Sequence, residues 1–262
     1  MQVRIRLIKI LLGLTMACLV AIMAAPVQAA DYEVGAGFGV KPDYEGSSDY
    51  EGVVIPYGMA AFDNGMWVKL QGLKLTANLV PKSWIPWLRL GPVYNNRASR
   101  SVVDNNKVDN LKNVSDASEL GLWGGIMIEG WFANLEYLMD TGNAHEGSYA
   151  TLRGGYNWKM SDTWAFVMCA HSTYADGDYM STYFGIDGAD SARSGLDTYD
   201  ADAGFKDVGL DLVADWKFLP SWKARGIGSY SLLIGDADDD SPVVDEGSEH
   251  QFFGGVLLIF SF

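Results

Sequence analysis

Residues 208–218 read VGLDLVADWKF, and this stretch decides the fold. Its even-numbered positions hold apolar residues, whereas its odd-numbered positions hold glycine, aspartate or lysine, with Val213 as the break in the pattern. Successive side chains of a β-strand point to opposite faces. The alternation therefore predicts a strand with one apolar side, and its length is typical of strands that cross a membrane.

The same alternation recurs along most of the chain. It is strict in residues 32–40, where the even-numbered positions are apolar or aromatic and glycine dominates the odd-numbered ones. Further stretches follow it at 120–128, 131–139, 150–158, 224–234 and 250–262. The pattern predicts a protein built mainly of strands.

Alternation is also found in soluble β-sandwiches, so the basic residues are needed to separate the two folds. Those within the predicted strands fall on the face opposite the apolar one: Lys69, Lys74, Arg89, Arg153, Lys206, Lys217 and Arg225. A basic side chain facing lipid at the membrane centre costs about 2–4 kcal/mol, whereas a barrel lumen offers water. We predict an all-β, transmembrane antiparallel β-barrel.

The connectors between strands alternate in length. Short ones are expected at 63–65, 81–83, 129–130, 159–162 and 219–221, and long polar ones at 41–51, 95–117, 141–147, 173–204 and 235–247. Outer-membrane barrels have short periplasmic turns and long extracellular loops. The order fits twelve strands if the chain reverses near Gly72, and ten if it does not.

Both ends of the chain carry export signals. Arg4, Arg6 and Lys9 precede an apolar run over 10–23, which predicts a signal peptide over residues 1–29 and a barrel domain over 30–262. Phe262 ends the chain in an alternating strand that also holds Phe260. We expect Phe260 and Phe262 to act as a barrel-assembly signal.

The charge balance excludes one class of partner. Lys and Arg number 19 against 33 Asp and Glu, a formal net charge of -14, whereas nucleic-acid binding needs clustered basic residues. Many of the acids lie in the long loops, which could bind divalent cations weakly. An EF-hand is excluded, because Ser241 and Gly247 occupy positions that need glycine and glutamate.

Few residues suggest chemistry. The histidines His145, His171 and His250 lack metal-ligand spacing, and we predict neither a metal nor a cofactor. Adjacent His171 and Ser172 point to opposite faces of a strand, so they cannot act together as base and nucleophile. With no Gly-x-Ser-x-Gly motif either, we predict no catalytic residues and place His171 in the lumen or at its rim as a hydrogen-bonding residue.

A succession of short motifs resembles the MipA/OmpV family of outer-membrane proteins. The resemblance covers residues 30–262 in the family's order and includes Gly91-Pro92 with Tyr94 and Arg97, and Glu119-Leu120-Gly121. Its other main positions, which we single out without assigning a role, are Asp43, Tyr44, Glu45, Gly46, Ser47, Tyr179, Met180, Tyr183, Phe184, Gly185, Asp236, Asp240, Ser241 and Pro242.

The resemblance implies a non-enzymatic scaffold. On this basis the protein lies among outer-membrane lipids and holds a lytic transglycosylase and a bifunctional murein synthase together during peptidoglycan remodelling. Tethering raises the effective concentration of such partners without chemistry by the barrel itself. The alternative is a small passive pore or a cation-bridged surface adhesin.

Overall fold

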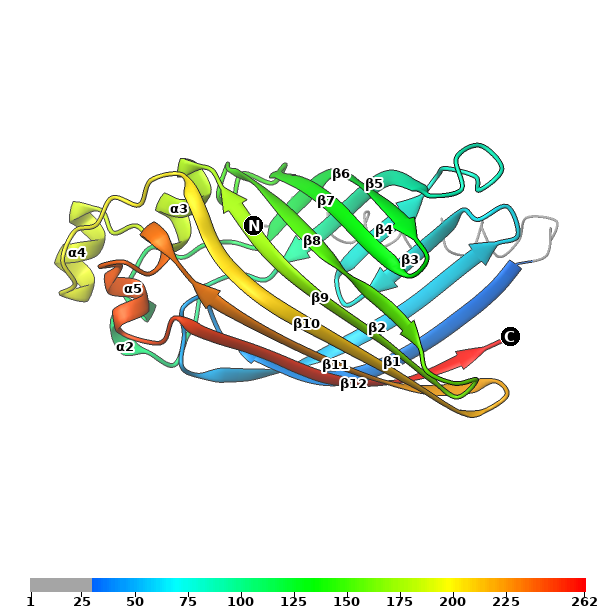
Figure 1. The fold of residues 1–262 in the computed structure, drawn as a ribbon. Coiled ribbons are helices and arrows are strands. Elements are labelled where there is room, and N and C mark those ends of the chain that lie inside the picture. The colour runs from blue at the N-terminus through cyan, green and yellow to red at the C-terminus, as the bar shows by residue number, and fades with distance from the viewer. Residues whose placement is uncertain (1–29) are drawn as a thin grey trace. The chain divides into compact units, whose positions relative to one another are not determined.

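The computed structural model describes residues 30–262, and the signal peptide expected over 1–29 lies outside the described residues. The described part forms a closed barrel of twelve strands, in which each strand pairs antiparallel with its sequence neighbour and the first pairs with the last (Figure 1). The strands are β1 (Ala30–Pro42), β2 (Tyr50–Phe62), β3 (Trp67–Gln71), β4 (Lys74–Asn78), β5 (Leu88–Arg97), β6 (Ala117–Ile128), β7 (Trp131–Asp140), β8 (Ser148–Lys159), β9 (Trp164–Ala175), β10 (Gly204–Leu219), β11 (Trp222–Leu233) and β12 (His250–Ser261).

The twelve-strand prediction is confirmed, and the ten-strand alternative is wrong. The uncertain point was the reversal near Gly72, which falls in the turn between the short strands β3 and β4. Gly72 has a φ of 60° there, a left-handed conformation that glycine adopts without steric cost.

The outer face of the barrel is apolar, as the alternation predicts. On β10, Val208, Leu210 and Leu212 are exposed, and β1 exposes Val34 and Phe38. Several lysine and arginine side chains of the strands instead form ion pairs on the lumen side, such as Lys74 with Glu136, and Arg225 with Asp215 on the neighbouring strand. This distribution is that of a barrel with lipid outside and polar groups inside.

The helices gather at one end of the barrel, which we call the loop end (Figure 1). They are α2 (Asn106–Asp109), α3 (Gly177–Tyr183), α4 (Gly188–Ser194), η1 (Gly235–Ala237) and α5 (Pro242–Asp245). The opposite end, which we call the turn end, carries the short connectors. No helix in the described part of the chain is long and apolar enough to cross a membrane.

The largest buried cluster also lies at the loop end. Tyr179, Met180 and Phe184, from α3 and the residue after it, are fully buried and pack with Leu138 and Leu233 of the barrel wall. Burial of apolar surface at about 25 cal/mol per Å² favours this packing. The long connection between β9 and β10 is therefore folded against the barrel.

Replacing Leu212 with arginine should destabilise the barrel by about 2–4 kcal/mol, because this exposed side chain lies near the middle of β10 and faces lipid. Urea titration of the protein folded in lipid vesicles measures the loss. The matched variant Phe218→Arg lies on the same face near the strand's end, where the cost falls to about 0–1 kcal/mol. Equal losses for the two variants would contradict a membrane-crossing β10.

Candidate functional site

Three motif segments that are distant in the sequence meet at the loop end. The Tyr179 hydroxyl donates a hydrogen bond to Glu45 at 2.7 Å, which joins α3 to the loop after β1. The Ser241 hydroxyl donates to the backbone carbonyl of Phe184 at 3.2 Å, which joins the loop after β11 to the same segment. The positions that we singled out in these three segments therefore belong to one assembly of loops.

Gly46 shows why this assembly needs a glycine. Its φ is 103°, and a Cβ atom there would lie 2.8 Å from a methyl carbon of Val244. Its carbonyl accepts a hydrogen bond from the backbone N–H of Ser248 at 2.8 Å. A larger residue would be strained at this φ and would displace the Val244 side chain of the loop after β11.

The centre of the site is the Glu119 carboxylate on β6, which is fully buried. It accepts hydrogen bonds from Asn95 at 2.7 Å, Arg97 at 2.8 Å and Tyr149 at 2.7 Å. His145 Nε2 lies 3.2 Å from it, and His145 Nδ1 accepts the N–H of Gly147, which fixes the proton on Nε2. A buried carboxylate is stable only when its oxygens are satisfied in this way.

Arg97 connects this carboxylate to the loops. Its guanidinium carbon lies 5.2 Å from the ring centre of Tyr149, 5.1 Å from that of Tyr179 and 5.4 Å from that of Tyr183, each within the range of cation–π attraction. Arg97 also lies 3.8 Å from Glu45. We call Arg97, Glu119, Glu45 and the three tyrosines the arginine hub.

A buried lysine completes the charge balance of the hub. Lys206 on β10 pairs with Glu45 and, at 2.6 Å, with Asp207. Burial alone would raise the pKa of the Glu45 carboxyl, but Lys206 and Arg97 outweigh burial and hold that pKa below its usual value. Burial raises the pKa of Tyr179 well above its usual value, so its hydroxyl stays protonated and remains a donor to Glu45.

A second polar network crosses β9, β10 and β11. His171 Nδ1 lies 3.1 Å from the Asp211 carboxylate, and His171 Nε2 lies 3.0 Å from the Ser231 hydroxyl. The His171 imidazole on β9 reaches Ser231 on β11 across β10, because the intervening residue is Gly209. A Cβ atom at Gly209 would lie 2.5 Å from the imidazole ring. His171 is thus a hydrogen-bonding residue of the lumen, while the Ser172 hydroxyl bonds elsewhere, to the Asp207 carbonyl.

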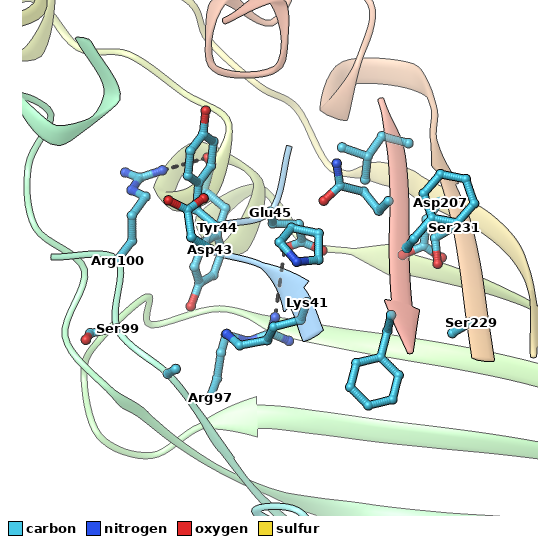
Figure 2. A pocket seen from close by; sticks show the side chains of 17 residues that line it. Lys41, Asp43, Tyr44, Glu45, Arg97, Ser99, Arg100, Asp207, Ser229 and Ser231 are labelled. Atoms are coloured by element: carbon cyan, nitrogen blue, oxygen red, sulfur yellow. Dashed lines mark hydrogen bonds and ion pairs between the residues drawn. The ribbon is translucent and has the colours of Figure 1, made fainter. Parts of the chain in front are cut away.

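A cleft of about 240 Å³ lies beside both networks. Figure 2 shows Asp43, Tyr44 and Arg100 on one side of it and Asp207, Ser229 and Ser231 on the other. A second cavity, of about 420 Å³, is lined by Trp67, Trp123 and basic side chains that include Lys69. Within residues 30–262, no three His, Cys, Asp or Glu side chains are grouped to hold a metal ion.

The remaining singled-out residues lie outside the hub. Asp236 accepts the Asp202 N–H at 2.8 Å, Asp240 has a φ of 61°, and Pro242 opens α5. Phe260 and Phe262 stack on each other at 5.8 Å, at the turn end. Their role in assembly stays a prediction.

Sequence reasoning missed part of the hub. Glu119 and Arg97 were noted only as parts of family motifs, and His145 only as a histidine without metal-ligand spacing. The one available signal was Glu119 itself, an acid that starts an apolar, glycine-rich run. Nothing in the sequence indicated that Tyr149, Tyr179 and Tyr183 converge on one guanidinium.

A closed antiparallel barrel with an apolar outer face and ion pairs on its inner face defines the class: this is an outer-membrane β-barrel protein. The family follows from the sequence. The family model of MltA-interacting protein MipA matches residues 34–262, and the chain belongs to that family. The search of curated proteins finds no match.

Solved structures to which the chain is similar include a porin and an outer-membrane channel. The NanC porin has a TM-score of 0.45 and 11% sequence identity, over 88% of this chain and 99% of that chain. The outer-membrane channel from Pseudomonas putida F1 has a TM-score of 0.42 and 12% identity, over 91% of this chain and 97% of that chain.

Proposed function

We propose that this protein is an outer-membrane anchor that holds murein-remodelling enzymes at the inner surface of the membrane and performs no catalysis itself. The family's description, MltA-interacting protein, supports a lytic transglycosylase as one partner. A bifunctional murein synthase is the second partner that we propose. Because outer-membrane barrels have short periplasmic turns and long extracellular loops, we orient the turn end toward the periplasm and the loop end toward the outside.

One observation carries this proposal, namely that the loops are bonded into the barrel at the loop end. Arg97 on β5 and Lys206 on β10 hold Glu45 between them, and α3 packs its apolar side chains against the wall. A passive pore needs an open, water-filled lumen. A barrel whose loops are fixed by buried ion pairs suits a rigid anchor better.

His171 lies between Asp211 and Ser231, as the histidine of a Ser-His-Asp triad lies between its two partners. A catalytic role in acyl transfer therefore has to be considered. Acyl transfer also needs donors aimed at the developing oxyanion. Ser231 lies within β11, paired with Gly209 on one side and Gln251 on the other, which engages the nearby backbone N–H groups in the sheet. We therefore assign the three side chains to holding β9, β10 and β11 together.

The turn end offers an apolar surface for a partner. The connector between β4 and β5 is the longest at this end, and its Trp84 side chain is 77% exposed. Ile85 and Trp87 beside it are also exposed. Exposed tryptophans are enriched among residues that dominate binding at protein interfaces.

Replacing Trp84 with alanine should weaken capture of the transglycosylase by roughly thirtyfold, because removing a central aromatic contact costs about 2 kcal/mol. The measurement is the dissociation constant between the purified enzyme and the barrel in detergent.

Trp158→Ala is the matched control, since Trp158 is an exposed tryptophan at the turn end of β8. It should leave the dissociation constant unchanged if its ring only contacts lipid. Equal weakening by both variants would mean that Trp84 acts as Trp158 does, through contact with the membrane. The proposal that the partner binds at Trp84 would then be wrong. Failure of every murein enzyme to bind the unmodified barrel would discard the anchor.

A further inference from the structure

The cavity of about 420 Å³ inside the barrel has a lining that the anchor function does not use. Its residues come from the six consecutive strands β3 to β8. Arg89 is the second residue of β5, and Met127 of β6 pairs with Phe132 of β7 beside the short turn that joins these strands. These positions place the cavity toward the turn end of the lumen, and we call it the turn-end cavity.

The polar side chains of this lining point into the lumen and can be reached there. On β7 the lining positions Phe132, Asn134 and Glu136 alternate with the exposed residues of the outer face, as the pleat of a strand requires. The side chains of Lys74 and Arg153 are each 32% exposed. A ligand in the turn-end cavity can therefore contact these charged groups directly.

The turn-end cavity is positively charged. Its lining holds a single acid, Glu136, and four basic residues, which are Lys69, Lys74, Arg89 and Arg153. The chain as a whole has a formal net charge of -14, so the cavity has the opposite sign to the protein around it. Charges of one sign between low-dielectric walls attract ions of the other sign. The lining therefore favours an anion.

Two of the four basic residues already have acidic partners. Lys74 pairs with Glu136, and Arg153 lies 3.9 Å from Asp211 on β10. These contacts compensate two positive charges. The ligand's charge is therefore set by the other two basic residues of the lining.

Lys69 and Arg89 have no carboxylate partner. Within residues 30–262, Lys69 makes no ion pair or hydrogen bond, and its ammonium nitrogen lies 5.8 Å from the centre of the Trp67 ring. In the same part of the chain Arg89 donates to the backbone carbonyls of residues 86 and 88 and forms no ion pair. Repulsion among neighbouring cations is unfavourable, and a bound anion relieves it. Two unpaired cations match a ligand with two negative charges.

The rest of the lining adds hydrogen-bonding groups and ring surfaces. The side chains of Gln71, Thr76 and Asn134 are partly exposed and make no hydrogen bond within the described part of the chain. Amides and hydroxyls can donate to phosphate or carboxylate oxygens. Trp67 and Trp123, whose ring centres lie 5.4 Å apart, supply apolar surface against which a flat ring can pack.

The volume of about 420 Å³ lies within the roughly 300–1,000 Å³ of pockets that enclose small organic ligands. We propose that the turn-end cavity binds a small organic dianion that carries a flat ring, with its charged groups against Lys69 and Arg89. The dianion is a phosphate monoester or a dicarboxylate, because a guanidinium recognises both through paired hydrogen bonds. This binding needs no protein partner and is separate from the anchoring of enzymes.

The test is a calorimetric titration of the full barrel domain in an amine oxide detergent at pH 7 and low salt, with no enzyme present. The probes are phenyl phosphate and phthalate, and saturable binding of at least one of them is expected. Binding of phenyl phosphate alone identifies the ligand as a phosphate monoester, and binding of phthalate alone identifies it as a dicarboxylate. Benzyltrimethylammonium, which has a similar ring and the opposite charge, should not bind.

Lys69→Met tests whether the binding uses this cavity. It removes a cation that makes no hydrogen bond and keeps the apolar stem, so the barrel should still fold while affinity for the dianion falls about tenfold or more. Lys217→Met is the matched control, since Lys217 is an exposed lysine near the turn end of β10 and lies outside the lining. It should bind as the unmodified protein does.

Three results would overturn the proposal. Absence of saturable binding by both dianions would leave water as the occupant of the cavity. Unchanged affinity in Lys69→Met would place the binding elsewhere on the barrel. Equal affinity for inorganic phosphate and phenyl phosphate would show that the tryptophans do not contact a ring of the ligand.

Discussion

Replacing Arg97 with methionine should lower the free energy of unfolding by about 3 kcal/mol. The change leaves the Glu119 carboxylate buried without its guanidinium, and breaking a buried ion pair from one side costs about 3–5 kcal/mol. We expect the lower end of that range because Asn95, Tyr149 and His145 still contact the carboxylate. Three cation–π contacts are lost as well.

Urea unfolding in lipid vesicles measures this loss, and a second substitution tests its cause. In the double variant Arg97→Met/Glu119→Gln the uncompensated charge is gone, so part of the lost stability should return. Lys107→Met is the control, since Lys107 is exposed and its pair with Glu246 should contribute at most about 1 kcal/mol. Additive losses in the double variant would show that Arg97 and Glu119 are not coupled.

Much of the fold could be predicted because each strand faces lipid on one side and the polar lumen on the other. Lipid selects Leu210 and Leu212 on one face of β10, and the lumen selects Asp211 and Asp215 on the other, so the sequence has the period of the strand. The weak point was β3 and β4, which are only 5 residues each. Such short strands hold too few alternations to distinguish from a loop.

The site could not be predicted in the same way, because its contacts join residues far apart in the sequence. Glu45 meets Lys206, and Arg100 donates to the Tyr183 carbonyl at 2.9 Å. Neither pair follows a period or a motif spacing. The family resemblance identified Glu45 and Tyr183 as notable without a reason, and the structure supplies one: both contact Arg97.

The hub and the proposed docking surface lie at opposite ends of the barrel. Its ion pairs and rings fix the loops to β5, β6, β8 and β10. The exposed connector with Trp84 lies at the other end, between β4 and β5. A partner bound at the turn end would therefore not contact the hub.

Glu45→Gln should destabilise the protein by about 2–3 kcal/mol at pH 7, and the difference from the unmodified protein should shrink on acidification. The Glu45 carboxylate accepts charge-assisted hydrogen bonds from Lys206 and Tyr179, and hydrogen bonds to charged groups contribute about 1.5–3 kcal/mol each. Because Lys206 and Arg97 outweigh burial, the folded-state pKa of Glu45 lies below its ordinary value of 4.5.

A carboxyl whose pKa is lowered by folding adds its full stability above the ordinary value and loses it as the pH falls through the folded-state pKa. The measurement is urea unfolding of both proteins from pH 7 down to pH 3. Other loop carboxylates, such as Asp187, titrate equally in both proteins and cancel in the difference. Glu51→Gln, which alters a half-exposed pair with Lys41, should show little difference at any pH. A difference between Glu45→Gln and the unmodified protein that stays constant to pH 3 would mean that the charge of Glu45 does not hold the loops to the barrel.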